Sequence, residues 1–114
     1  MIFLVFIVEN NQMEISVAGL SHLNSDGTSR QNYLLFCKVG QEMMLVRDGR
    51  NPYDPYAVKV CNENGQQIGF IPQVMTRDFA PRLDRGEGYS VVIKEITDPD
   101  EKGFKRCKID FEWK

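Results

Sequence analysis

One segment of the chain concentrates side chains that could recognise a ligand. It runs from Arg47 to Ala57 and reads Arg-Asp-Gly-Arg-Asn-Pro-Tyr-Asp-Pro-Tyr-Ala. Its two prolines restrict the backbone, so we expect a stiff loop. In such a loop an arginine can bind a phosphate through its fork of donors, and a tyrosine can stack on a base for about 1–3 kcal/mol. An ionised aspartate can accept a hydrogen bond from a hydroxyl. The segment therefore predicts non-covalent recognition.

Asp54 narrows the kind of ligand that this loop could take. A carboxylate repels a phosphate, so Asp54 suits a free hydroxyl at a strand end better than a continuous phosphate backbone. Residue chemistry also permits a plainer interpretation, in which Asn51 and Asp54 only bond to their own backbone in a tight turn. Both interpretations stay open at this point.

Catalytic and metal-binding patterns are not found in the sequence. The chain has three cysteines and one histidine, and no Cys-x-x-Cys pair, so a zinc site would need all four of these scattered residues. We expect Cys37, Cys61 and Cys107 to be small buried hydrophobes in a reducing cytoplasm. No Gly-x-x-x-x-Gly-Lys loop or paired acid and base stands at a catalytic spacing. We therefore expect neither an enzyme nor a cofactor.

The charge balance limits the mode of binding. The 114 residues include 14 Lys and Arg against 16 Asp and Glu, a formal net charge of -2. This argues against a protein that coats duplex DNA by bulk charge, but it permits a local basic site. Only four bases lie in positions 1–57. Three of them, Lys38, Arg47 and Arg50, lie before or within the stiff loop.

A second group of bases lies near the C-terminus and is interleaved with acids. The bases are Lys102, Lys105, Arg106 and Lys108, and the acids are Asp98, Asp100, Glu101 and Asp110. We therefore expect this region to be nearly neutral.

The elements that must position these residues are short strands separated by turns. Alternating or apolar runs predict strands at 14–18, 42–47, 57–61, 67–71, 89–96 and 107–113. Asn64-Gly65 predicts a hairpin over 57–71, and 33–37 is compatible with a strand or a short helix. The pattern favours a mainly β fold, a small antiparallel β-barrel of about six strands with a short helical insert.

The helical insert is expected after Pro72, which suits the first turn of a helix. Met75, Phe79 and Leu83 recur at four-residue steps and form one apolar stripe. Pro81 lies inside this stretch, so two short helical pieces are expected rather than one helix.

The first twelve residues are expected to be an extension, and 13–114 to be the domain proper. Met1–Val8 is apolar but too short to cross a bilayer as a helix, and it lacks the features of a secretory signal, so no membrane association is expected. Its β-branched and aromatic content predicts an extra strand. Such a strand could pair with a second copy of the chain and form a homodimer.

Three motifs resemble one known family. Residues 51–60, Asn-Pro-Tyr-Asp-Pro-Tyr-Ala-Val-Lys-Val, resemble the signature of the HIRAN domain, which follows a strand ending in Arg. Val17–Leu20 resembles the opening strand of that family, and Ile68–Pro72 resembles its Gly-aromatic-(Ile/Leu)-Pro element. Leu83–Gly86 fits the end of its helical insert, so order and spacing agree across about residues 13–97.

The resemblance implies a fold and a function. The family has an OB-like β-barrel with helical additions, and it occurs attached to helicase-like ATPases of DNA repair and as stand-alone bacterial proteins, the type that this chain resembles. Its best understood members grip the free 3′ end of single-stranded DNA. The chain would then be a non-catalytic module for a DNA end in repair or processing, acting with a separate helicase or nuclease.

The resemblance also implies roles for residues of the loop. Asp54 would accept from the 3′ hydroxyl, and Tyr53 would line or stack on the terminal nucleotide. Asn51 would hold the loop shape. Arg47, at the strand end leading into the pocket, and Arg50 would contact phosphates.

Two departures from the family pattern remove positive charge. Ser21 and His22 stand where the DNA-end-binding members carry an Arg and then an aromatic residue. Phe70 and Gln73 lie where those members place basic residues, and the nearest cation is Arg77. His22 and Phe70 can still stack. The lost charge predicts weak, salt-sensitive binding confined to an end, and it keeps open an alternative, a protein-interaction or regulatory β-barrel that has lost DNA binding.

Overall fold

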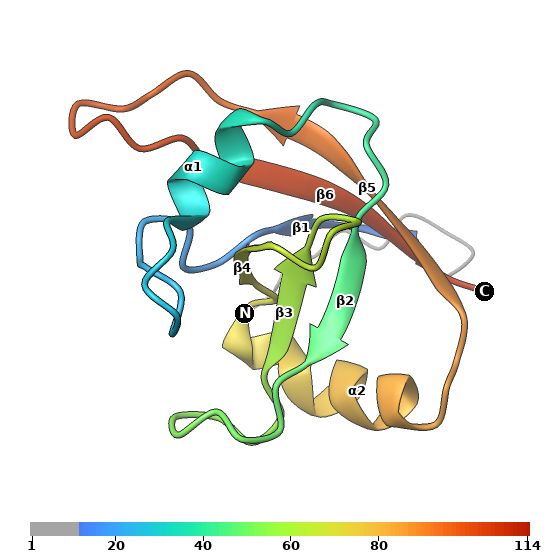
Figure 1. Cartoon of the computed structure of the whole chain (residues 1–114). Coiled ribbons are helices and arrows are strands. Elements are labelled where there is room, and N and C mark those ends of the chain that lie inside the picture. Colours follow the sequence, from blue (N-terminus) through green and yellow to red (C-terminus); the bar gives the residue numbers. More distant parts are fainter. Residues whose placement is uncertain (1–11) are drawn as a thin grey trace.

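The computed structural model describes residues 12–114, which form six strands and two helices. The apolar run Met1–Val8, its predicted strand and the predicted dimer contact lie outside the described residues. Figure 1 shows the elements in chain order. They are β1 (Gln12–Ser16), α1 (Arg30–Leu35), β2 (Met44–Arg47), β3 (Val58–Cys61), β4 (Gln67–Phe70), α2 (Gln73–Asp84), β5 (Tyr89–Ile96) and β6 (Cys107–Trp113).

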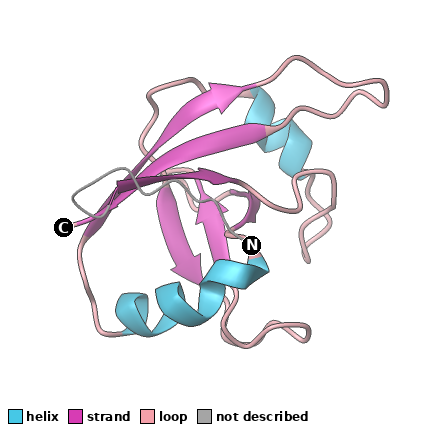
Figure 2. Cartoon of the chain, turned by 180° about the vertical axis from the view of Figure 1, so that it is seen from behind, coloured by secondary structure: helices cyan, strands magenta, loops and turns pink. Residues whose placement is uncertain are grey.

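The strands form two three-stranded antiparallel sheets, in the orders β1-β6-β5 and β2-β3-β4. Side chains alternate across each strand, so β6 buries Cys107, Ile109, Phe111 and Trp113 on one face and exposes most of the residues between them. Helix α2 packs against β2 and β3, and α1 packs against β4. In Figures 1 and 2, α1 lies beside the loop that joins β5 to β6.

Short bridges join the two sheets at both edges. Ala18 and Phe70 exchange two backbone hydrogen bonds of 2.8 and 2.9 Å, and Glu42 bridges to Val92. The segment that follows β1 pairs with β4 only through Ala18 and Phe70, because Gly19, with a φ of 71°, turns the chain away. The predicted mainly β fold is confirmed. The described strands form two linked sheets, and the predicted closed barrel is not confirmed.

Gly69 allows the sheets to approach each other at this bridge. A Cβ atom at position 69 would lie 2.5 Å from Val17 Cγ1 and 2.6 Å from the Ala18 carbonyl oxygen. Both distances are shorter than van der Waals contact, so only glycine fits between these segments.

The hairpin predicted over 57–71 is confirmed, with Gly65 at a φ of 78° in its turn. Residues 33–37 were compatible with a strand or a short helix, and the first three of them are helical, since α1 ends at Leu35. The Ser29 hydroxyl caps α1 by accepting from the Asn32 N–H at 3.1 Å.

The expectation of two helical pieces was wrong, since α2 continues through Pro81. Phe79 and Ala80 are each 1% exposed, and the burial of this face outweighs the hydrogen bond that proline removes near the end of the helix.

Aromatic rings close the core beside α2. The ring centroid of Phe79 lies 4.8 Å from that of Phe111 and 5.1 Å from that of Trp113. The Arg82 guanidinium lies over the Trp113 ring, 4.1 Å from its centroid, which adds a cation–π contact. Trp113 and Phe111 share one buried face, as the alternation of the last strand predicts.

The three cysteines are free and buried, as expected for small hydrophobes. Burial raises the pKa of all three thiols. The pKa of Cys107 rises to about 12, because of burial first and the nearby Cys37 second. Among residues 12–114, no helix is both long and apolar enough to cross a membrane.

Candidate nucleic-acid interface

Asn51 organises the stiff loop between β2 and β3. Its side-chain oxygen accepts from the N–H groups of Tyr53 (2.8 Å) and Asp54 (3.1 Å), and its amide nitrogen donates to Asp48 Oδ2 at 3.1 Å. The side chain therefore mimics a backbone turn. These bonds are the ones expected if Asn51 holds the shape of the loop. The plainer interpretation, a tight turn, predicts the same bonds, so they do not by themselves identify a binding site.

Asp54 fastens the loop to α2 and keeps acceptor positions open. Its Oδ1 accepts from the Tyr56 N–H at 2.8 Å, and its Oδ2 lies 2.9 Å from the Thr76 hydroxyl. That hydroxyl also lies 2.9 Å from the Gln73 carbonyl oxygen, so one proton serves two acceptors. A carboxylate oxygen has about two lone-pair sites, and each oxygen of Asp54 uses one of them within the described residues. The half-buried carboxylate can therefore accept from a ligand hydroxyl.

Arg47 ends β2, as predicted, and directs its donors at the protein. Its Nη1 donates to the Ala57 carbonyl at 2.8 Å and its Nη2 to the Pro55 carbonyl at 3.0 Å. Its Nε donates to Asp84 Oδ1 at 3.0 Å. These bonds hold the far end of the loop and join it to α2. Arg47 is therefore a positioning residue of the loop.

A cavity of about 590 Å³ opens beside the loop, and we call it the loop cavity. It is lined by Ala18, Gly19, His22, Arg30, Asn51, Tyr53, Asp54, Ala57, Phe70, Ile71, Gln73 and Thr76. Five of the predicted site residues come together in this lining, from three separate segments of the chain. They are His22, Asn51, Tyr53, Asp54 and Phe70. Tyr53 is 90% exposed, so its ring is free to stack on a ligand.

Arg50 and Arg77 lie outside the lining of the loop cavity. Arg50 is exposed in the loop. Arg77 is exposed on α2 and lies over the ring of Tyr56, with 5.1 Å between its Cζ and the ring centroid. Neither arginine is brought to the cavity wall.

Sequence reasoning missed Arg30, which supplies a cation to the cavity wall. Arg30 is 7% exposed, and it donates to the Gly19 carbonyl at 2.7 Å and to Asn24 Oδ1 at 2.8 Å. Its Cζ lies 4.9 Å from the Phe70 ring centroid. Desolvation lowers the pKa of Arg30, and the guanidinium stays charged at neutral pH.

Nothing local in the sequence distinguishes Arg30 from a solvated arginine at the start of a helix. Its partners Gly19, Asn24 and Phe70 lie on other segments, and only the fold brings them together. Within the described part of the chain, no group of three or more His, Cys, Asp or Glu residues could hold a metal ion.

A family model and one relative match much of the chain. The family model described as "HIRAN domain" matches residues 11–114. A protein of Arabidopsis thaliana named "Putative SWI/SNF-related matrix-associated actin-dependent regulator of chromatin subfamily A member 3-like 1" is 31% identical over 71 residues. The match covers 61% of this chain and only 8% of that protein, so the chain corresponds to a small part of this relative.

Two solved structures share the fold. The HIRAN domain of human HLTF superposes with a TM-score of 0.68 at 21% identity, covering 90% of this chain and 74% of that one. A protein from Lactobacillus plantarum superposes with a TM-score of 0.62 at 19% identity, covering 87% of this chain and 91% of that one.

Proposed function

Because the chain belongs to the HIRAN domain family, we propose that it binds single-stranded DNA at a free 3′ end, as a non-catalytic module in DNA repair or processing. Membership of the family supports a nucleic-acid-binding module. The lining of the loop cavity supports the more specific proposal of 3′-end binding, because an exposed aromatic ring, a carboxylate with open acceptor positions and a buried guanidinium line the same cavity. The resemblance also suggests a separate helicase or nuclease as the partner acting on the bound end.

Asp54 would read the end of the strand. Each of its oxygens keeps an acceptor position, so the carboxylate can accept from a 3′ hydroxyl while the Tyr56 N–H and the Thr76 hydroxyl hold it in place. A hydrogen bond to a charged group contributes about 1.5–3 kcal/mol. A 3′ phosphate would instead place negative charge beside the carboxylate. The site should therefore select the hydroxyl end.

Aromatic rings and one guanidinium would hold the terminal nucleotide. The exposed ring of Tyr53 offers a stacking surface, and His22 and Phe70 line the same cavity. Arg30 uses Nε and Nη1 for protein acceptors, which leaves Nη2 for a phosphate. One buried cation in a protein of net charge -2 supports binding at an end rather than along a long strand.

Fluorescence anisotropy of short single-stranded oligonucleotides tests this function. The protein should prefer a free 3′ hydroxyl over a 3′ phosphate by about tenfold or more, as one hydrogen bond to a charged group implies. Asp54→Asn keeps an oxygen for the Tyr56 N–H but removes the charge, so the preference should disappear. Asp110→Asn is the matched control, because Asp110 is exposed on β6 and lies outside the loop cavity.

Two outcomes would overturn end recognition. Equal affinity of the wild-type protein for the two ends would show that Asp54 does not read the hydroxyl. Negligible binding of both oligonucleotides would favour a protein-interaction module instead.

A further inference from the structure

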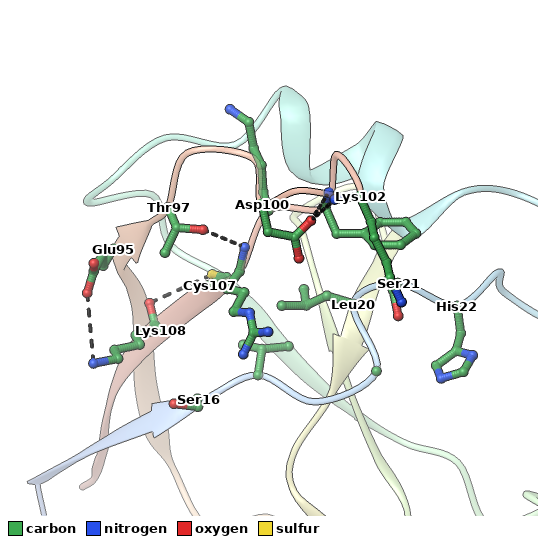
Figure 3. A pocket seen from close by; sticks show the side chains of 15 residues that line it. Ser16, Leu20, Ser21, His22, Glu95, Thr97, Asp100, Lys102, Cys107 and Lys108 are labelled. Atoms are coloured by element: carbon green, nitrogen blue, oxygen red, sulfur yellow. Dashed lines mark hydrogen bonds and ion pairs between the residues drawn. The ribbon is translucent and has the colours of Figure 1, made fainter.

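A second hollow of about 580 Å³ lies next to the loop cavity, and we call it the hairpin hollow. One side is the segment from Ser16 to His22, and the other is the loop that joins β5 to β6 (Figure 3). Gly19 and His22 line both hollows. The two hollows therefore adjoin each other at this segment.

Cations dominate the lining of the hairpin hollow. It contains four basic side chains, Lys102, Lys105, Arg106 and Lys108, and two carboxylates, Glu95 and Asp100. Lys108 lies 3.8 Å from Glu14 and 3.9 Å from Glu95. Over residues 12–114, the other three cations form no ion pair within 4.0 Å. Lys108 therefore pairs with acids outside the interleaved group, and within residues 12–114 none of Asp98, Asp100, Glu101 and Asp110 forms an ion pair within 4.0 Å.

Asp100 shapes the loop through bonds to its backbone, and within residues 12–114 it forms no ion pair within 4.0 Å. Its Oδ1 accepts from the N–H groups of Lys102 and Phe104, both at 2.9 Å. These bonds, that of Phe104 first, lower the pKa of Asp100. In Figure 3, Asp100 and Lys102 meet at the loop while Ser21 and His22 lie on the opposite segment. Asp100 keeps its charge near Lys102 and Arg106, but no residue of 12–114 holds the Lys102 ammonium in an ion pair.

Gln31 of α1 fixes the two sides of the hairpin hollow relative to each other. Its amide nitrogen donates to the carbonyls of Leu20 (3.0 Å) and Lys105 (2.9 Å). Its amide oxygen accepts from the Lys105 N–H at 2.8 Å. One side chain therefore spans from the 16–22 segment to the hairpin. Three hydrogen bonds of Gln31 therefore tie the two sides of the hollow together.

We propose that the hairpin hollow binds the phosphate backbone of single-stranded DNA on the 5′ side of the terminal nucleotide. This inference rests on the proposed function, because it takes the 3′ end to lie in the loop cavity. Charge complementarity favours a polyanion, and the shared wall at Gly19 and His22 provides continuity. The cations missing from the start of α2 are thereby replaced from another part of the fold.

The experiment compares a trinucleotide with a nonanucleotide, both with a free 3′ hydroxyl, in anisotropy titrations at several salt concentrations. The trinucleotide reports on the loop cavity and the longer strand also on the hairpin hollow. Wild-type protein should bind the nonanucleotide about tenfold more tightly, with a steeper salt dependence of about 0.7 in log–log slope per additional phosphate contact.

Lys102→Gln with Arg106→Gln should remove most of that advantage and leave the trinucleotide unaffected. The matched control, Lys38→Gln with Lys114→Gln, makes the same charge change outside both hollows. A nonanucleotide with uncharged methylphosphonate linkages upstream should bind both the wild-type protein and the double variant like the trinucleotide.

The outcomes separate the two proposals. The trinucleotide could bind with a preference for the 3′ hydroxyl while neither the length of the oligonucleotide nor the double variant changes the affinity. In that case DNA binding by the hairpin hollow is overturned and the proposed function stands. If the control variant loses as much affinity as the double variant, general charge and not the hollow is responsible. If neither oligonucleotide binds, both proposals fall.

Discussion

The loop cavity and the hairpin hollow share a wall, yet they hold their basic residues in opposite ways. Around the cavity the arginines bind the protein, since Arg30 donates to Gly19 and Asn24, and Arg47 fastens the loop. In the hairpin hollow, three of four cations form no ion pair with any residue of 12–114. Arg30 and Arg47 thus build a rigid site. Three of the cations without an ion pair in residues 12–114 gather in the hairpin hollow.

Substitution of one glycine in each region should give the largest difference in unfolding free energy between the loop cavity and the hairpin hollow. Gly69→Ala places a Cβ against Val17 and the Ala18 carbonyl beside the loop cavity, so it should cost about 3 kcal/mol of unfolding free energy. Gly103→Ala, in the hairpin loop, meets no atom within 4 Å but has a φ of 86°, and should cost about 1 kcal/mol. Urea unfolding midpoints measure both. Equal losses would contradict the tighter packing beside the cavity.

Substitution of one arginine in each region should give a smaller difference in unfolding free energy. Arg47→Ala removes three hydrogen bonds and leaves the Pro55 and Ala57 carbonyls without a guanidinium partner, so it should cost about 2 kcal/mol and weaken trinucleotide binding. Arg106→Ala should change the unfolding free energy by less than about 0.5 kcal/mol and weaken only longer strands. A stability loss in the Arg106 variant as large as that in the Arg47 variant would show that its guanidinium also serves the fold.

Acid should loosen the hairpin hollow in a small, local way. The folded pKa of Asp100 lies below 3.8 because the N–H groups of Phe104 and Lys102 donate to its carboxylate. The stabilisation is therefore present above pH 3.8, where the unfolded group is ionised, and is lost as pH falls through the folded pKa. The amide proton shifts of Phe104 and Lys102 should titrate together with that midpoint. A midpoint above 3.8 would contradict these bonds.

Local patterns in the sequence predicted local structure well. Asn64-Gly65 indicated the hairpin of β3 and β4, and the alternation of the last strand indicated β6. The side-chain chemistry of Asn51 and Asp54 indicated a loop held by its own hydrogen bonds. In the hairpin and the loop the interacting groups lie a few residues apart, so the sequence contains the whole interaction. For β6 the alternation identifies the buried face, although its partner β1 lies far away in the sequence.

The roles of residues that depend on long-range contacts could not be predicted from the sequence. Arg30 is the one base of positions 1–57 outside the loop motif and its approach, and its role depends on contacts with Gly19 and Phe70 across the fold. The positioning role of Arg47 needs Asp84 on α2. The pattern of acids and bases near the C-terminus did not show that Asp100 would bond to backbone N–H groups. It also did not show that Lys102, Lys105 and Arg106 would form no ion pair with residues 12–114.

The burial of Trp113 gives the protein a built-in optical probe. It is the single tryptophan of the chain, it is 3% exposed, and it lines neither the loop cavity nor the hairpin hollow. Its packing against Phe79 and Arg82 ties its emission to the intact core. Tryptophan fluorescence should therefore follow unfolding and not DNA binding. One sample of each variant can then yield two separate signals, core integrity from the indole and ligand capture from a labelled oligonucleotide.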